Sequence, residues 1–79
     1  MSGELMQRER ALQVLEYQAN ALVHGVPSDP AQLAALLREI PEGKLEARPA
    51  GEGMKALTVR WRSPQGESQR TLVVFARKP

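Results

Sequence analysis

The stretch that decides the fold runs from Leu57 to Gly66 and reads LTVRWRSPQG. Its apolar residues Leu57, Val59 and Trp61 alternate with polar ones, and this period of two is typical of a β-strand with one buried face. Serine, proline and glycine follow close together, as in the loop of a β-hairpin. The stretch therefore predicts a strand that places Trp61 in the core, followed by a turn into another strand.

The same period recurs on both sides of this stretch. Residues 44–49 alternate between charged and less polar side chains, although Pro49 favours the edge or the end of a strand. Gly51 and Gly53 then reverse the chain before the central strand. A third strand is predicted from Thr71 to Arg77, so that residues 44–78 form a three-stranded antiparallel β-meander.

The third strand is apolar on both faces, because Val73 and Phe75 alternate with Leu72, Val74 and Ala76. In a simple meander this strand lies at an edge, where a long apolar strand invites aggregation unless it is paired or covered. Two explanations remain open. Either a neighbouring subunit or an additional segment covers Val73 and Phe75, or the helices of the same domain wrap around the strand.

The first half of the chain has helical periodicity. Leu5, Leu12 and Ala19 form one row with seven-residue steps, and Leu15 and Leu22 form a second row on the same side. These rows predict an amphipathic helix over residues 4–24, which covers the sheet with its apolar side. Gly25 is suited to end it because glycine adopts positive φ without strain.

A second, shorter helix is predicted over residues 30–39. Asp29 is placed to accept hydrogen bonds from the free amides of its first turn, and Pro30 fits the first helical position. Pro41 stops the helix. The prediction is therefore one α+β domain over residues 1–79, with a helical half at 4–40 and the meander at 44–78. The second helix should bury Leu33, Leu36, Leu37 and Ile40.

The predicted core draws on both halves of the chain. It combines the apolar side of the two helices with one face of the meander. Its expected members are Leu12, Leu15, Leu22, Leu36, Leu57, Val59, Trp61, Leu72 and Val74.

Composition excludes several classes of protein. The chain has no cysteine, so disulfides and thiolate metal sites are ruled out, and its single histidine makes a zinc site improbable. No apolar run is long enough to cross a bilayer, which predicts that these 79 residues are soluble by themselves. Residues 1–43 carry a net charge of −3 and residues 44–79 carry +5. This charge asymmetry is suited either to binding a polyanion or to head-to-tail contact between identical subunits.

The sequence offers little catalytic chemistry. His24 falls at the end of the first helix, where an imidazolium interacts favourably with the helix dipole. The serines lie in termini, turns or a strand start, and none lies in a Gly-x-Ser-x-Gly motif. We therefore expect no enzymatic activity, no cofactor and no tightly bound metal ion. Elemental analysis that found a stoichiometric metal would overturn this expectation.

The basic residues of the meander favour an alternative function, which is binding to a nucleic acid or another polyanion. Phosphates attract such residues, and an exposed aromatic ring beside them can stack on bases. The alternation of the central strand argues against nucleic-acid binding, because Trp61 points to the face opposite Arg60 and Arg62. The candidate residues for contact with a polyanion are Arg60, Arg62, Arg70, Arg77 and Lys78.

Two segments carry a resemblance to a known family. The helix segment from Arg10 to Asn20, RALQVLEYQAN, and the strand–turn stretch from Leu57 to Gly66 resemble the globular part of type IV pilin-like proteins. The likeness is to minor pilins and type II secretion pseudopilins, in which a Val/Thr strand leading to tryptophan, a short turn with glycine and a final apolar strand recur. The resemblance covers most of the chain. The family's N-terminal glycine, aromatic residue and long apolar segment are absent from these 79 residues.

The resemblance implies that the function is assembly. The natural gene product would begin with about twenty further apolar residues, continuous with the helix near Glu4 and long enough to span a membrane. That segment would sit in the inner membrane and then in the centre of a filament, with this domain facing the periplasm or the cell surface. The partners would be other pilin or pseudopilin subunits, and the isolated domain would be mostly monomeric. Motility, adhesion, DNA uptake and protein secretion all use such filaments.

Two other functions remain open from the sequence. A nucleic-acid-binding module would bind in a salt-sensitive way and lose binding when Arg60 and Arg62 are replaced. A homodimer that pairs its third strands would dissociate when Val73 or Phe75 becomes charged.

Overall fold

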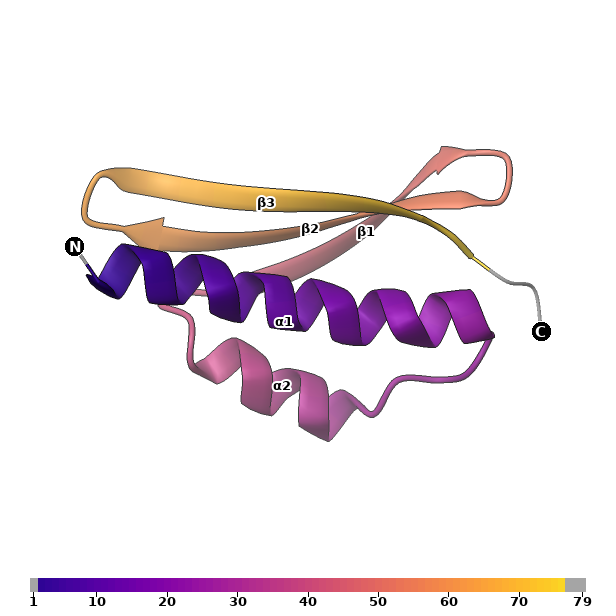
Figure 1. Ribbon diagram of the computed structural model, residues 1–79, viewed down its shortest axis with the longest axis horizontal. Coiled ribbons are helices and arrows are strands. Elements are labelled where there is room, and N and C mark those ends of the chain that lie inside the picture. Colours follow the sequence, from indigo (N-terminus) through magenta and orange to yellow (C-terminus); the bar gives the residue numbers. More distant parts are fainter. Residues whose placement is uncertain (1, 77–79) are drawn as a thin grey trace.

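The computed structural model describes residues 2–76, and their side chains from Met6 onward, as an α+β domain with two helices followed by a three-stranded antiparallel sheet. The helices are α1 (Ser2–His24) and α2 (Pro30–Arg38), and the strands are β1 (Lys44–Gly51), β2 (Met54–Ser63) and β3 (Gly66–Phe75). The strand order is β1-β2-β3 (Figure 1). This confirms the predicted fold class and the order of the elements.

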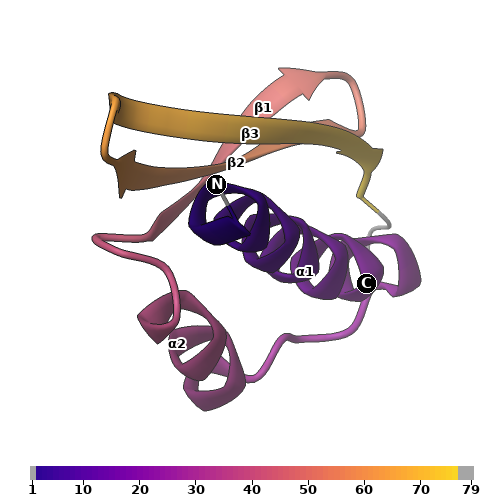
Figure 2. The same cartoon turned by 60° about the vertical axis from the view of Figure 1, so that its left-hand side comes forward.

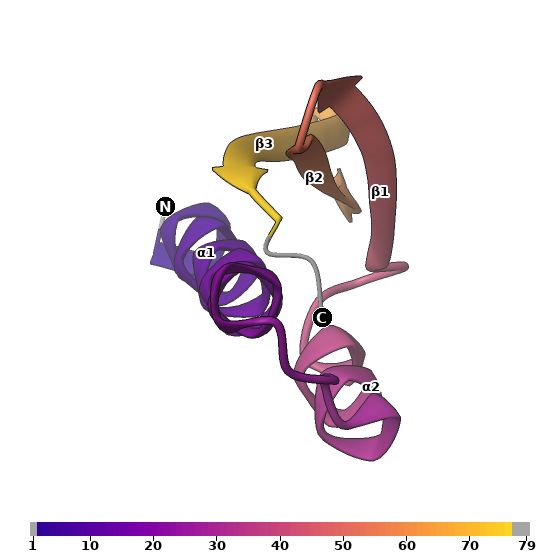
Figure 3. The same cartoon turned by 90° about the vertical axis from the view of Figure 1, so that its right-hand side faces the viewer.

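Helix α1 lies along one face of the sheet, and the opposite face carries no helix (Figures 1 and 2). Viewed along its axis, α1 lies beneath β3 and β2, whereas α2 lies away from β3, toward the start of β1 (Figure 3). We call the helix-covered side the inner face and the other side the outer face. The domain therefore has a single layer of helix on a single sheet, with one side of the sheet open to solvent.

The predicted end of α1 and start of α2 are confirmed by the local geometry, whereas α1 begins at Ser2 rather than residue 4 and α2 ends at Arg38 rather than residue 39. Asp29 is the N-cap of α2, since its Oδ1 accepts a hydrogen bond from the amide of Ala31 at 2.9 Å. Gly25 follows α1 with a φ of 67°, in the left-handed region that glycine tolerates. The amide of Val26 donates to the carbonyl of Ala21 at 2.9 Å, which satisfies one of the last carbonyls of α1.

The core lies between α1 and the inner face of the sheet. Leu15, Leu57, Val59 and Trp61 are buried as predicted. Several other predicted members are only partly buried at its margin, where they pack against the buried cluster: Leu22, Leu36, Leu72 and Val74. Helix α2 has no buried residue, so its leucines Leu33, Leu36 and Leu37 flank the core, while Ile40 just beyond it is 2% exposed.

The predicted apolar rows of α1 are confirmed only in part, because Leu15 and Ala19 are buried and Leu22 packs against the core, but the buried side of the helix is rotated away from Leu12. The fully buried positions are Ala11, Val14 and Leu15, and neither Ala11 nor Val14 belonged to a predicted row. Leu12 is half-buried rather than buried, and the side chain of Leu5 lies outside the described residues. The buried side of α1 includes small side chains three and four residues from its leucines, which a search for large leucines overlooks.

Tyr17 and Arg10 attach α1 to the ends of α2. The Tyr17 hydroxyl accepts a hydrogen bond from the amide of Asp29 at 3.0 Å, and Arg10 donates through Nη1 to the carbonyl of Glu39 at 3.0 Å. Both side chains leave α1 on the side opposite Leu12, given 100° of rotation per residue. The side of α1 that carries Leu12 is therefore the side away from α2.

The second hairpin is tighter than predicted. Strand β3 begins at Gly66 rather than Thr71, and only Pro64 and Gln65 form the turn. The hydroxyl of Ser63 donates to the carbonyl of Gly66 at 2.8 Å and closes it. Residues 67–70 are polar on both faces, so their sequence has no apolar alternation, yet they pair with β2 in regular register.

Replacing Gly43 with alanine should destabilise the domain by about 1–3 kcal/mol, the usual cost of an overpacked site. A Cβ at Gly43 would lie 2.9 Å from the Cβ of Ile40 and 3.1 Å from the carbonyl oxygen of Leu37. The backbone cannot move freely there, because the Gly43 amide donates to the carbonyl of Ile40 at 3.0 Å. Urea denaturation of the two proteins measures the difference, and equal midpoints would contradict the tight packing of this turn.

Candidate functional site

The outer face of the sheet carries most of the residues that the sequence singles out. Arg60 and Arg62 alternate along β2 with the buried Trp61 and Leu57, as predicted, and therefore point to the outer face. Trp61 is 3% exposed, so its ring is not available for stacking on a base.

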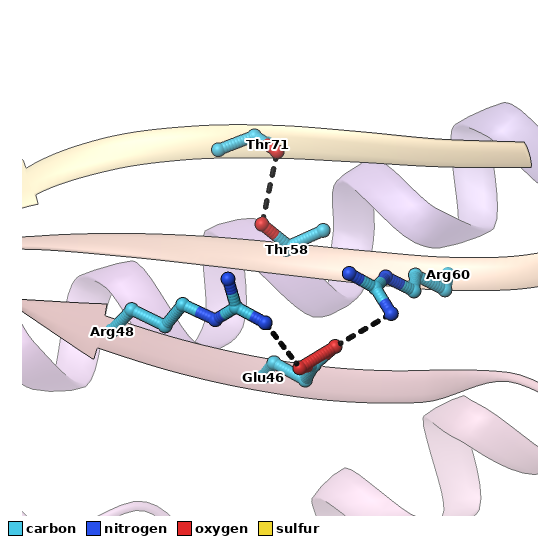
Figure 4. A network of polar contacts seen from close by, with 5 residues as sticks. All are labelled: Glu46, Arg48, Thr58, Arg60 and Thr71. Carbon is cyan, nitrogen blue, oxygen red and sulfur yellow. Dashed lines mark hydrogen bonds and ion pairs between the residues drawn. The ribbon is translucent and has the colours of Figure 1, made fainter.

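Glu46 lies between two of the arginines. Its carboxylate pairs with Arg48 on its own strand and with Arg60 on the neighbouring strand, each at 3.3 Å (Figure 4). Arg62 faces Glu42 more loosely, with Nε 3.8 Å from the carboxylate. All these groups are at least one-third exposed, and ion pairs in such settings contribute about 0–1 kcal/mol. Their main effect is to neutralise the positive charge of this face.

The structure does not bring the five predicted polyanion contacts together. Arg70 lies opposite Val59 in the β2–β3 register, so it belongs to the inner face, on the other side of the sheet from Arg60 and Arg62. Arg77 and Lys78 lie outside the described residues. Sequence reasoning missed Glu46, because its contact with Arg60 depends on the cross-strand register.

A cleft of about 330 Å³ opens at the end of the sheet where β1 begins and β2 ends. Its charged lining residues comprise three carboxylates and three cations: Glu42, Glu46, Glu67, Lys44, Arg60 and Arg62. Balanced charges give such a cleft no strong preference for an anion or a cation. Among residues 2–76, no group of three or more histidine, aspartate or glutamate side chains is placed to hold a metal ion.

At the other end of the outer face, the side chains of β2 and β3 are apolar. Val73 and Phe75 on β3 lie opposite Ala56 and Met54 on β2, and they are 47% and 70% exposed. Nearer the centre, Thr58 and Thr71 share a hydrogen bond between their hydroxyl oxygens at 2.9 Å (Figure 4). The helices of the domain therefore cover only one face of β3, and the explanation that they wrap around the strand is wrong for Val73 and Phe75.

Replacing Glu46 with glutamine should strengthen binding to an immobilised polyanion such as heparin, because Arg48 and Arg60 lose the carboxylate that they share. Glu16→Gln on the exposed side of α1 makes the same change in net charge and serves as the control. Glu46→Gln should elute at a higher salt concentration than Glu16→Gln. Equal elution of the two variants would show that the ion pairs do not mask the arginines.

No family model, curated protein or solved structure matches this chain. Within the described residues, neither helix is both long and apolar enough to cross a membrane.

Proposed function

We propose that this domain is the globular part of a filament subunit, either a minor pilin of a type IV pilus or a type II secretion pseudopilin. The observation that carries the proposal is the arrangement of α1 and the sheet. One helix of 23 residues runs along an antiparallel meander and covers only its inner face. This arrangement agrees with the resemblance of the helix and strand–turn segments to pilin-like proteins.

Assembly fits the surfaces of the domain better than catalysis does. Exposed apolar side chains occur on both layers, including Met6 and Val23 on α1 and Phe75 on β3. His24 is exposed at the end of α1, and the hydroxyl of the buried Ser63 is used to close the hairpin. The proposed partners are therefore other filament subunits, which contact the domain through its surface.

Nucleic acid is a less favoured partner. Glu46 neutralises part of the positive charge, Trp61 is buried, and Arg70 lies on the opposite side of the sheet from Arg60 and Arg62. Single-stranded nucleic acids are bound where a positive groove coincides with exposed aromatic rings. No described aromatic side chain lies beside the arginine pair on the outer face.

For the natural protein we propose an inner-membrane location before assembly and a periplasmic or surface location of this domain afterward. The test is fractionation of cells that encode it, with antibody detection in inner membranes and in filaments sheared from the surface. The natural protein should appear in both fractions, and a version that begins at Ser2 should appear in neither. Detection of the natural protein in the cytoplasmic fraction alone would overturn the proposal.

A further inference from the structure

We propose that the free edge of β3 pairs with the same edge of a second copy of this chain, in an antiparallel arrangement centred on Val73. The two sheets would join into one sheet of six strands. This interface concerns the isolated domain and is independent of the proposed function.

The two edge strands of the sheet differ in how well they are protected against pairing with a further strand. On β1, Lys44, Glu46 and Arg48 place charges along the edge, and Pro49 with an irregular register near Gly51 disturbs its end. These are devices by which natural sheets prevent strand addition. Strand β3 has none of them between Thr71 and Phe75, and it pairs with β2 without a bulge. Within residues 2–76, no strand lies on its other side.

The hydrogen-bond pattern identifies which residues of β3 face the free edge. The amide of Ala76 donates to the carbonyl of Gly53 at 2.8 Å, so Ala76 bonds toward β2. Because such pairs alternate along an antiparallel ladder, the even-numbered residues of β3 bond toward β2. The odd-numbered residues, including Thr71, Val73 and Phe75, direct their amides and carbonyls outward. Their side chains also share the outer face.

The outward backbone groups of β3 match those of a second antiparallel copy when the pairing is centred on Val73. With Val73 opposite its own copy, Thr71 lies opposite Phe75 of the second copy, and all three positions have outward backbone groups. No charged side chain lies between Thr71 and Phe75, so the two-fold axis brings no like charges together. The exposed side chains of Val73 and Phe75 would each gain a neighbour from the other copy on the outer face, Val73 beside Val73 and Phe75 beside Thr71.

Helix α1 supplies a second observation. The two-fold axis is perpendicular to the joined sheet, so both α1 helices lie on its inner face. The side of α1 away from α2, toward the β3 edge in Figure 3, carries Leu12, which is half-buried, and Val23, which is 46% exposed. A second α1 across the axis would cover this side. Val23 lies in the last turn of α1 and Phe75 ends β3, and these two element ends lie at the same end of the domain (Figure 1).

Pairing centred on three residues of each copy would make a small interface, and contacts that bury less than about 1,200 Å² in total are weak or transient. The dimer should therefore form with increasing protein concentration and dissociate on dilution. This concentration dependence agrees with a domain that is mostly monomeric when dilute.

The test uses single cysteine variants of the 79-residue chain, which has no cysteine of its own. In the proposed register, the Cα atoms of two Val73→Cys residues lie about 5.5 Å apart, within disulfide range. Two Thr71→Cys residues lie about 13 Å apart along the paired strands, which is beyond disulfide range. Mild oxidation should therefore cross-link Val73→Cys and leave Thr71→Cys monomeric.

Sedimentation velocity over a range of concentrations provides the second measurement. Wild type should shift toward dimer as concentration rises, and Val73→Lys should stay monomeric. Ala47→Lys, which adds the same charge at an exposed position of β1, should dimerise like wild type. Circular dichroism verifies that both lysine variants are folded. The proposal is overturned by a wild type that is monomeric throughout, by cross-linking of Thr71→Cys instead of Val73→Cys, or by loss of the dimer in Ala47→Lys alone.

Discussion

Trp61→Ala should lower the free energy of unfolding by about 3–5 kcal/mol, the usual cost of removing a large buried aromatic side chain. Trp61 is 3% exposed and belongs to the cluster that joins β2 to α1. Domains this small lie near the low end of the usual total stability of about 5–15 kcal/mol, so the variant should lose most of its stability. Urea denaturation followed by circular dichroism measures the effect without relying on tryptophan fluorescence.

Two further variants test whether the loss of stability in Trp61→Ala comes from lost packing. Arg62→Ala alters the next residue of β2, which is exposed on the outer face, and should change stability by less than about 0.5 kcal/mol. Trp61→Phe keeps most of the apolar volume and removes the indole N–H, which is buried without a hydrogen-bond partner in the described structure. It should cost much less than Trp61→Ala, because an unpaired buried donor is itself unfavourable. A Trp61→Ala protein as stable as Arg62→Ala would show that Trp61 is not in the core.

Leu15→Ala should destabilise the domain by about 2–5 kcal/mol, because Leu15 is fully buried and alanine would leave a cavity between α1 and the sheet. Leu12→Ala is the matched control. It makes the same chemical change three residues earlier, where the side chain is only half-buried. The cost at Leu12 should therefore be clearly smaller, as measured by thermal or urea unfolding. A larger loss of stability in Leu12→Ala than in Leu15→Ala would show that Leu12 faces the core, as the leucine rows of the sequence suggest.

The elements could be predicted from the sequence because their signals are local. Asp29 with Pro30 marks the start of α2, Gly25 marks the end of α1, and the alternation around Trp61 assigns the faces of β2. The phase of α1 could not be predicted in the same way. The small residues Ala11 and Val14 are buried in one cluster with residues of the sheet and Ile40, which is a property of tertiary packing rather than of the helix alone.

The site was less predictable than the fold. The sequence places Arg60 and Arg62 on one face correctly, since this needs only the period of a strand. The pairing of Arg60 with Glu46 depends on the register between β1 and β2, and these residues are separated by a full hairpin. The apolar character of the third strand follows from the sequence alone. Its exposed residues do not, because they depend on the position of α1 beneath β3.

The central claim is that this domain belongs to a filament subunit of the pilin class, and the natural reading frame tests it most directly. Sequencing the gene upstream of Met1, together with mass spectrometry of the N-terminus of the native protein, should reveal about twenty apolar residues that join α1 in helical phase. Continuity of phase is essential, since one helix would then serve both as the cover of the sheet and as the stem for assembly. A native protein that begins at Met1 or Met6, with no apolar segment before it, would contradict the account.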